Sequence, residues 1–257
     1  MSDFSYRHYT ETLREAIGMG YQIIPFSKLE QNLDKSFILL RHDVDFSPSA
    51  AVKMARLERE VGVSSTYFLQ LHSHFYSLFG DKEFPAQKIL ELGHELGCHY
   101  DVKFMKFFPT VKKGLETEIS IMEEFAQTKI SSYAQHDPSV DGYSPVEIPG
   151  CIDAYSLTQK HSIKYLSDSV QRWREGCFCQ HLGKHEQLQV AVHPEIWSES
   201  GMSAAKIYST LSASTIKDVE AKYAWLRKLH KYYLANRPIP ENLRDYAPKQ
   251  RKRQTTL

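Results

Sequence analysis

Two aspartates, Asp43 and Asp45, stand two positions apart after a short apolar run at residues 37–40. In extended backbone alternate side chains share a face, so both carboxylates would project to the same side of the chain. Carboxylates held this close repel each other, and one pKa rises unless a cation or a hydrogen-bond donor lies between them. The pair therefore indicates a metal ligand or a catalytic base. The alternative is that these acids cap the helix expected after Ser47.

Titratable side chains also follow later apolar runs, at the points where strands are expected to end. They are His99 and Asp101 within residues 93–101, His136 and Asp137 after 130–134, Asp168 after 163–167, and His193 after 188–192. One such residue alone is more often an ordinary loop residue than a ligand. In parallel α/β barrels, however, the carboxyl ends of the strands meet on one face, where sites are built. The repetition therefore predicts one cluster in space.

The elements that would position these side chains alternate along the chain. Apolar runs predict strands at 21–26, 37–40, 65–71, 130–134, 163–167 and 188–192, and helical spacing predicts helices at 6–17, 48–61, 84–92, 109–127, 154–161 and 216–234. This order is typical of an α/β fold in which crossover helices connect a parallel sheet that is closed, or nearly closed, into a barrel. We expect residues 1–36 to pack on a barrel formed by 37–235, and 236–257 to be a solvated basic tail with KQRKR at 249–253.

Composition restricts the possible partners. The 257 residues carry a net charge of +1, which gives no general attraction to nucleic acid or to an anionic membrane. No run approaches the roughly 18 apolar residues of a membrane span, and the N-terminal stretch has no apolar core. We therefore expect a cytoplasmic protein with no membrane span and no nucleic-acid partner. The four cysteines are better interpreted as thiols or metal ligands than as disulfides.

Five segments together resemble a known family in their order and spacing. They are HDVD (42–45), GHELGCHYD (93–101), QHDPS (135–139), YLSDSVQRW (165–173) and VAVHPEIW (190–197). The chain resembles the polysaccharide deacetylases of the NodB-homology type, carbohydrate esterase family 4, and most of all the cytoplasmic branch whose first motif reads HDVD. The resemblance implies a single-domain distorted (β/α) barrel that hydrolyses N-acetyl groups of amino sugars with a divalent metal, commonly zinc.

The resemblance assigns the metal ligands incompletely. It implies that Asp45 and His99 bind the metal, but the second histidine of the family's second motif falls on Lys103, which cannot bind a metal when protonated. The third ligand would then be Asp101 or His136. We favour His136, because zinc sites with three protein ligands commonly mix imidazole and carboxylate, and Asp101 would then orient His99.

The resemblance also assigns the proton carriers. Asp43 would be the base, and His193 the general acid that protonates the leaving amine, oriented by Asp168. The family's third motif has an arginine that steadies the base; it is missing here, and Arg41 or Arg172 could replace it. In the alternative interpretation, His193 only ends a strand and Asp168 only caps a helix.

Two further groups have open interpretations. Aromatic residues near the motifs, Trp173 and Trp197 together with His74, Phe75 and Tyr76, could stack on sugar rings or pack in the core. Cys177, Cys179, His181 and His185 form C-x-C-x-H-x3-H, which could hold a separate zinc or belong to a flexible loop.

These observations predict a metal-dependent hydrolase that removes an acetyl group from an N-acetylated sugar or a sugar-containing precursor. For a cytoplasmic enzyme the substrate would be a nucleotide-linked or lipid-linked amino sugar. One alternative is hydrolysis of another C–N bond, such as a formamide or ureide. The other is a catalytically silent barrel that binds saccharide or a partner protein, suggested by Lys103 and the missing arginine.

Overall fold

The computed structural model describes residues 3–78 and 85–244. The chain divides into two compact units, Met1–Ser203 and Ala204–Leu257. The division into 1–36, 37–235 and 236–257 that the sequence favours stays a prediction, and the basic run at 249–253 lies outside the described residues.

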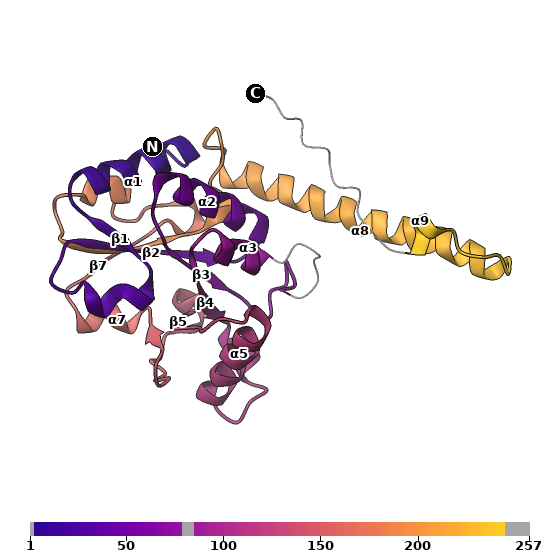
Figure 1. Cartoon of the computed structure of the whole chain (residues 1–257), viewed down its shortest axis with the longest axis horizontal. Coiled ribbons are helices and arrows are strands. Elements are labelled where there is room, and N and C mark those ends of the chain that lie inside the picture. Colours follow the sequence, from indigo (N-terminus) through magenta and orange to yellow (C-terminus); the bar gives the residue numbers. More distant parts are fainter. Residues whose placement is uncertain (1–2, 79–84, 245–257) are drawn as a thin grey trace. The chain divides into compact units, whose positions relative to one another are not determined.

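A parallel sheet forms the first unit (Figure 1). In the described residues it has eight strands in the order β6-β5-β4-β3-β2-β8-β7, with β1 paired to the first half of β2. Their bounds are β1 Gln22–Ile24, β2 Phe37–Val44, β3 Thr66–Leu69, β4 Glu95–Tyr100, β5 Ser132–Gln135, β6 Ile152–Asp153, β7 Lys164–Ser167 and β8 Gln187–Val192. The sheet curls into a half-barrel with helices around it, which confirms the predicted distorted (β/α) barrel class. Among the described residues no ladder joins β6 to β7, so the barrel is open there.

Strand β2 lies inside the sheet, between β3 and β8, and is buried along its whole length. It runs to Val44, beyond the predicted end at residue 40, because its charged residues have partners on both faces. Arg41 pairs with Asp43 on the inner face, and His42 pairs with Glu58 of helix α2 on the outer face. A buried strand can contain charged residues when they are paired, whereas an unpaired charge would be expected to end the strand.

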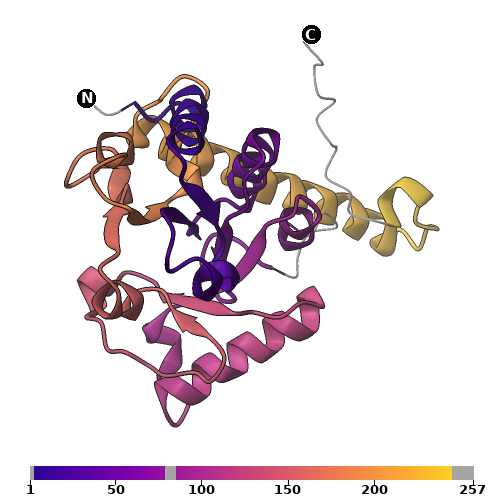
Figure 2. The ribbon, with the colours of Figure 1, turned by 60° about the vertical axis from the view of Figure 1, so that its left-hand side comes forward.

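Helices cover the outer face of the sheet. They are α1 (Tyr6–Gly18), α2 (Pro48–Val61), α3 (Pro85–Glu91) and α5 (Val111–Ala126), and α2 packs against both α1 and α3 (Figure 2). Side-chain oxygens of Ser5, Ser47 and Thr110 cap α1, α2 and α5. Ser47 thus takes the capping role that Asp43 and Asp45 would have in the alternative interpretation.

The inner face has its own apolar core. Leu39, Phe68 and Ala134 of the sheet pack there with Phe26 of the 3-10 helix η1 (Phe26–Gln31) and Leu157 of α7 (Ser156–Lys160). Phe68 and Ala134 of this core lie in register with Asp43 and His99, so the apolar packing reaches the polar side chains at the carboxyl ends of the strands.

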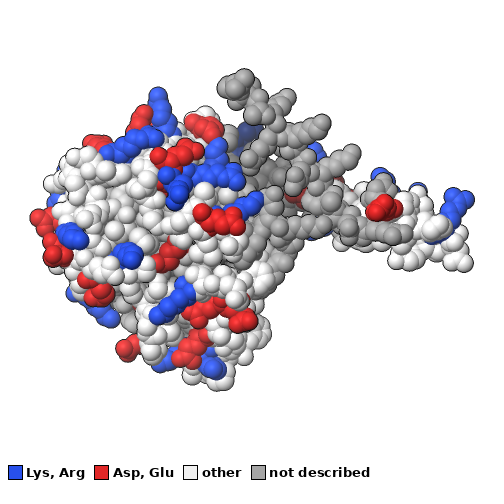
Figure 3. All heavy atoms as spheres, in the orientation of Figure 1, with Lys and Arg blue, Asp and Glu red and all other residues white. Residues whose placement is uncertain are grey.

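Short helices complete the first unit: α4 (Val102–Met105), α6 (Pro138–Asp141), and the 3-10 helices η2 (Ser169–Gln171), η3 (Phe178–His181) and η4 (Pro194–Ile196). On the face shown in Figure 3, cationic and anionic side chains are interspersed.

The second unit contains the long helix α8 (Ala204–Leu234), which begins well before the predicted residue 216, and α9 (Glu241–Arg244). The predicted tail is therefore helical at its start, and Trp225 Nε1 donates to the Leu243 carbonyl at 3.2 Å. None of the helices in the described ranges is both long enough and apolar enough to cross a bilayer.

Candidate functional site

Six neighbouring strands, from β5 through to β7, deliver polar side chains to the same end of the sheet. In the order of the strands, these side chains are His136 after β5, His99 in β4, Gln70 after β3, Asp43 and Asp45 at the end of β2, His193 after β8, and Asp168 after β7. Parallel register aligns them: the Cα of His99 is opposite that of Ala134, and that of Asp43 is opposite Phe68. The sequence prediction that these strand ends converge agrees with the observed geometry.

Asp45, His99 and His136 form the centre of this cluster. Asp45 Oδ1 lies 3.2 Å from His99 Nε2 and 3.2 Å from His136 Nδ1. One ligand atom from each residue lies within 4.8 Å of the other two, a spacing that could hold a metal ion. Burial opposes the charge of Asp45, but hydrogen bonds with His136 and His99 hold the pKa of its carboxyl well below the usual value.

The environment of His99 fits a cation. Its Nδ1–H donates to the Ala134 carbonyl at 3.0 Å, so Nε2 faces the carboxylate of Asp45 and hydrogen-bonds to it only when it carries a proton. Two acceptors at 3.2 Å repel unless a proton or a cation lies between them. A divalent metal held by imidazole and carboxylate ligands satisfies both.

Asp101 has a different place from the predicted one. Its carboxylate caps α4 by accepting from the Lys103 amide at 2.8 Å, so the Ala134 carbonyl, and not Asp101, orients His99. The side chain of Lys103 is largely exposed and its Nζ pairs with Asp141 at 3.0 Å. Lys103 therefore contributes no ligand, and His136 takes the third position of the cluster.

Gln70 is a site residue that the sequence interpretation missed. Its Nε2 donates to Asp45 Oδ1 at 3.1 Å, and Gln70 is buried. Its position directly after β3 is the same signal that marks the other residues, but its amide is neutral, whereas the sequence pattern consists of titratable groups. Gln70 orients the carboxylate that the two imidazoles face.

Arg41 holds Asp43. Nε donates to Oδ1 at 3.0 Å and Nη2 to Oδ2 at 2.6 Å, and both side chains are buried. Burial raises the pKa of Asp43, but the charge and hydrogen bonds of Arg41, together with the nearby His99 and His193, bring the pKa below the usual value. Of the two arginines proposed to replace the missing one, Arg41 makes this contact, whereas Arg172 is exposed.

His193 is held by Asp168, which is fully buried. Asp168 Oδ1 accepts from His193 Nδ1 at 2.6 Å and from the His193 amide at 3.0 Å, while Oδ2 accepts from Trp197 Nε1 at 2.7 Å. Burial lowers the pKa of His193, but the Asp168 carboxylate reverses this and holds it well above the usual value. Nε2 is left facing the cluster, 3.9 Å from Asp45 Oδ2. Asp168 precedes η2 without a capping hydrogen bond from its side chain.

The two tryptophans pack inside the protein. Trp197 is 2% exposed and its ring lies 5.0 Å from that of Phe4; Trp173 is 6% exposed and its ring lies 5.7 Å from that of Phe178. Neither indole has an open face for a sugar. Phe75 is 63% exposed, and its ring meets edge-on that of Phe46, the residue that follows Asp45.

The proposed C-x-C-x-H-x3-H zinc site is not assembled from its four residues. His181 and His185 stack on each other with ring centroids 5.7 Å apart, and His181 Nε2 contacts the Glu175 carbonyl. Cys177 and Cys179 instead group with His8 of α1.

No family model matches the sequence, and no curated protein matches it either. Among solved structures, a family 4 carbohydrate esterase from Bacillus anthracis is 15% identical, with a TM-score of 0.40, over 80% of this chain and 86% of that one. A CE4 family pseudoenzyme from Bacillus anthracis is 14% identical, with a TM-score of 0.39, over 71% and 63%. A mutant of the peptidoglycan deacetylase PdaC from Bacillus subtilis is 12% identical, with a TM-score of 0.37, over 78% and 99%. At this level of similarity, function has to be judged from the side chains of the site.

Proposed function

We propose that the protein is a metal-dependent hydrolase that removes an acetyl group from an N-acetylated sugar or a sugar-containing precursor. The observation that carries this proposal is the meeting of His99 Nε2 and His136 Nδ1 on Asp45 Oδ1, each at 3.2 Å. The motifs that resemble the polysaccharide deacetylases support the choice of reaction.

The proposed metal ligands are Asp45, His99 and His136. A carboxylate with two imidazoles leaves a position free for water or substrate, and we propose zinc because this mixed ligand set is common in its catalytic sites. The chemistry that such a cation supplies is polarisation of an amide carbonyl and a lower pKa for water.

Asp43 and His193 move the protons. Asp43, kept ionised by Arg41, accepts a proton from the attacking water. His193, kept protonated by Asp168, donates its Nε2 proton to the amide nitrogen as the C–N bond breaks. Acetate and a free amine are the products, so one water is consumed and no other reactant is needed.

The proposed substrate is an amino sugar linked to a nucleotide or lipid, and the proposed location is the cytoplasm. Phe75 is the aromatic side chain whose exposure suits stacking on a sugar ring near Asp45. We propose no nucleic-acid partner.

Two measurements test the proposal. In metal analysis, Asp45→Ala and His99→Ala should each contain about one bound divalent ion per chain less than the wild type. Acetate release should be measured with a panel of nucleotide-linked and lipid-linked N-acetylated amino sugars, comparing the wild type with Asp43→Asn. Full activity in Asp43→Asn would show that Asp43 is not the base. Hydrolysis of formamides or ureides, with no acetate release from the amino sugars, would indicate a reaction at another C–N bond.

A second candidate is a catalytically silent barrel that binds saccharide or a partner protein. Lys103, paired with Asp141 where the resembling family has a metal-binding histidine, favours it. A purified chain that has no metal at Asp45 and cannot be reloaded, yet binds amino sugars, would support this alternative.

A further inference from the structure

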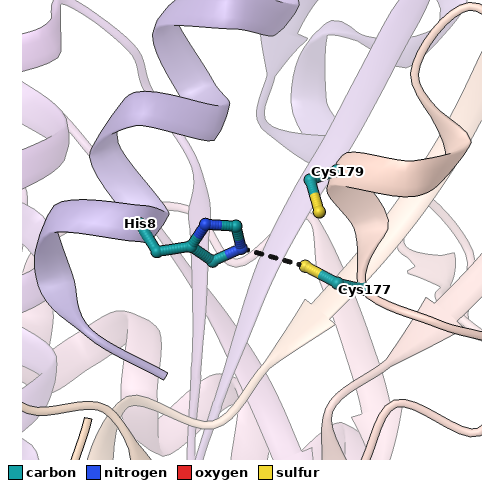
Figure 4. A group of neighbouring side chains, drawn as sticks. All are labelled: His8, Cys177 and Cys179. Atoms are coloured by element: carbon teal, nitrogen blue, oxygen red, sulfur yellow. Dashed lines mark hydrogen bonds between the residues drawn. The ribbon is translucent and has the colours of Figure 1, made fainter. Parts of the chain in front are cut away.

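A second group of ligand-type side chains lies apart from the residues of the proposed active site. It consists of His8, Cys177 and Cys179, and Figure 4 shows the imidazole of His8 pointing at the two sulfur atoms. His8 Nε2 lies 3.3 Å from Cys177 Sγ. One ligand atom of each residue lies within 4.8 Å of the other two.

Local structure places the three groups. His8 lies in the first turn of α1, where its amide donates to Oγ of the capping Ser5 at 3.1 Å. Cys177 precedes η3 and Cys179 lies within it, and the Gln180 amide donates to the Cys177 carbonyl at 2.9 Å. This turn brings two thiols that are two residues apart to the same imidazole.

The distances fit a thiolate metal site. Zn–S bonds of about 2.3 Å and Zn–N bonds of about 2.0–2.1 Å in a tetrahedron put ligand atoms roughly 3.5–3.8 Å apart. The spacing of the three side chains is close to this, so a small rotation of the side chains suffices. Cys177 is buried, while His8 and Cys179 are half-buried, so a fourth position can be filled by water.

We propose that His8, Cys177 and Cys179 bind a zinc ion at a second site, distinct from the Asp45 cluster. Two thiolates and an imidazole are ligands that zinc prefers, whereas magnesium and calcium prefer oxygen. Binding of Zn²⁺ to two thiols and a neutral imidazole releases two protons and requires no oxidant or reductant.

The site joins two distant parts of the chain. The residue after His8, Tyr9, packs on Trp197 with ring centroids 5.3 Å apart, and Trp197 donates to Asp168. The residue after Cys177, Phe178, packs on Tyr9 and on Trp173. A zinc ion here would therefore fasten α1 to the segment after β7, behind the pair of Asp168 and His193.

Cobalt substitution tests the site in the full-length protein. In an Asp45→Ala/His99→Ala background, Co²⁺ added to reduced protein should give a thiolate-to-cobalt charge-transfer band, which ligands from the Asp45 cluster cannot produce. Cys177→Ser and Cys179→Ser should each lose most of the band, and His8→Asn should weaken cobalt binding by at least about tenfold.

Matched controls are available. Cys151→Ser changes another half-buried thiol, and His185→Asn changes a histidine of the C-x-C-x-H-x3-H segment; both should keep the band. Zinc should also raise the Tm of the background protein, and this rise should be absent in His8→Asn. Circular dichroism shows which variants are folded. If a cysteine variant is not folded, His8→Asn still tests whether the site binds metal.

Three results would overturn the inference. The first is a folded, reduced protein that shows no thiolate band with cobalt. The second is a cobalt affinity that is unchanged in folded His8→Asn, or a band that persists unchanged in both cysteine variants. The third is a Cys177–Cys179 disulfide in freshly isolated protein that takes up no cobalt after reduction.

Discussion

The guanidinium of Arg41 donates two hydrogen bonds, of 3.0 and 2.6 Å, to the carboxylate of Asp43, which lies two positions later on the same strand. Two parallel charge-assisted hydrogen bonds fix both the position and the charge of the proposed base. The guanidinium also lies over the ring of Tyr155, with 4.6 Å from Cζ to the ring centroid. Asp43 therefore depends on a cation from its own strand.

Arg41→Met should remove activity and destabilise the fold. It leaves a buried carboxylate without its partner, which typically lowers the free energy of unfolding by about 3–5 kcal/mol. Urea unfolding and acetate release measure the two effects. Arg172→Met changes the other candidate, an exposed arginine, and should alter neither stability nor acetate release. An inactive Arg172→Met together with an active Arg41→Met would mean that Arg172, and not Arg41, supports the base.

Gln70→Leu should weaken metal binding by about 10–100-fold while the fold is kept. The amide orients Asp45 Oδ1 from 3.1 Å, and loss of such an outer hydrogen bond lowers metal affinity by this amount. Titration calorimetry with Zn²⁺ measures it, ideally in a Cys177→Ser background. Gln22→Leu, at an exposed glutamine of β1, is the control. Equal affinities in the two variants would show that Gln70 does not orient the ligand.

Trp197→Phe should lower kcat by about tenfold and leave KM nearly unchanged. The ring remains, but Asp168 loses one donor, so His193 is less firmly oriented. Trp173→Phe is the matched control, because Trp173 Nε1 is buried with no hydrogen-bond partner among the described residues. If both variants lose the same activity, packing rather than the hydrogen bond is responsible.

Glu58→Gln should remove a pH-dependent part of the stability. Burial raises the pKa of Glu58, but His42 and the other donors around it lower the pKa to about 2, against an ordinary value of 4.5. Since the folded pKa is the lower one, the carboxylate stabilises the fold above pH 4.5, by about 3 kcal/mol, and this contribution is lost as pH falls towards 2.

The test is urea unfolding of the wild type and Glu58→Gln from pH 7 to pH 3. The gap in unfolding free energy should narrow as the pH falls. Glu60→Gln, at an exposed glutamate of the same helix, should follow the wild type. A gap that stays constant with pH would mean that the Glu58 charge does not stabilise the fold.

Much of this architecture follows from local patterns. The limits of α2 agree with the prediction because a proline after a capping serine starts the helix and Gly62, at φ +89°, ends it. Titratable residues at strand ends likewise indicated the place of Asp45, His99 and His136. The sequence pattern starts this helix too late, at residue 216, because serine and threonine disfavour helix; in α8 the side chains of Ser209 and Thr210 donate to carbonyls four residues earlier.

Other features depend on contacts that no local pattern contains. His8 meets Cys177 across 169 residues, and nothing near His8 in the sequence marks it as a ligand. The choice between Arg41 and Arg172 needed the direction of each side chain. Trp197 could stack on a sugar ring or pack in the core by its place in the sequence, and the structure shows the second: its N–H and its ring are both in contact inside the protein.

The position of β8 between β2 and β7 has a consequence for folding during synthesis on the ribosome. Residues 45–186 are synthesised after β2 and before β8. Until β8 is made, the edge of β2 that pairs with β8 therefore has no partner strand for its backbone groups. Such an edge can recruit other chains. A chain interrupted before residue 187 would therefore be expected to aggregate, and a chaperone that shields β2 would aid production of the intact protein.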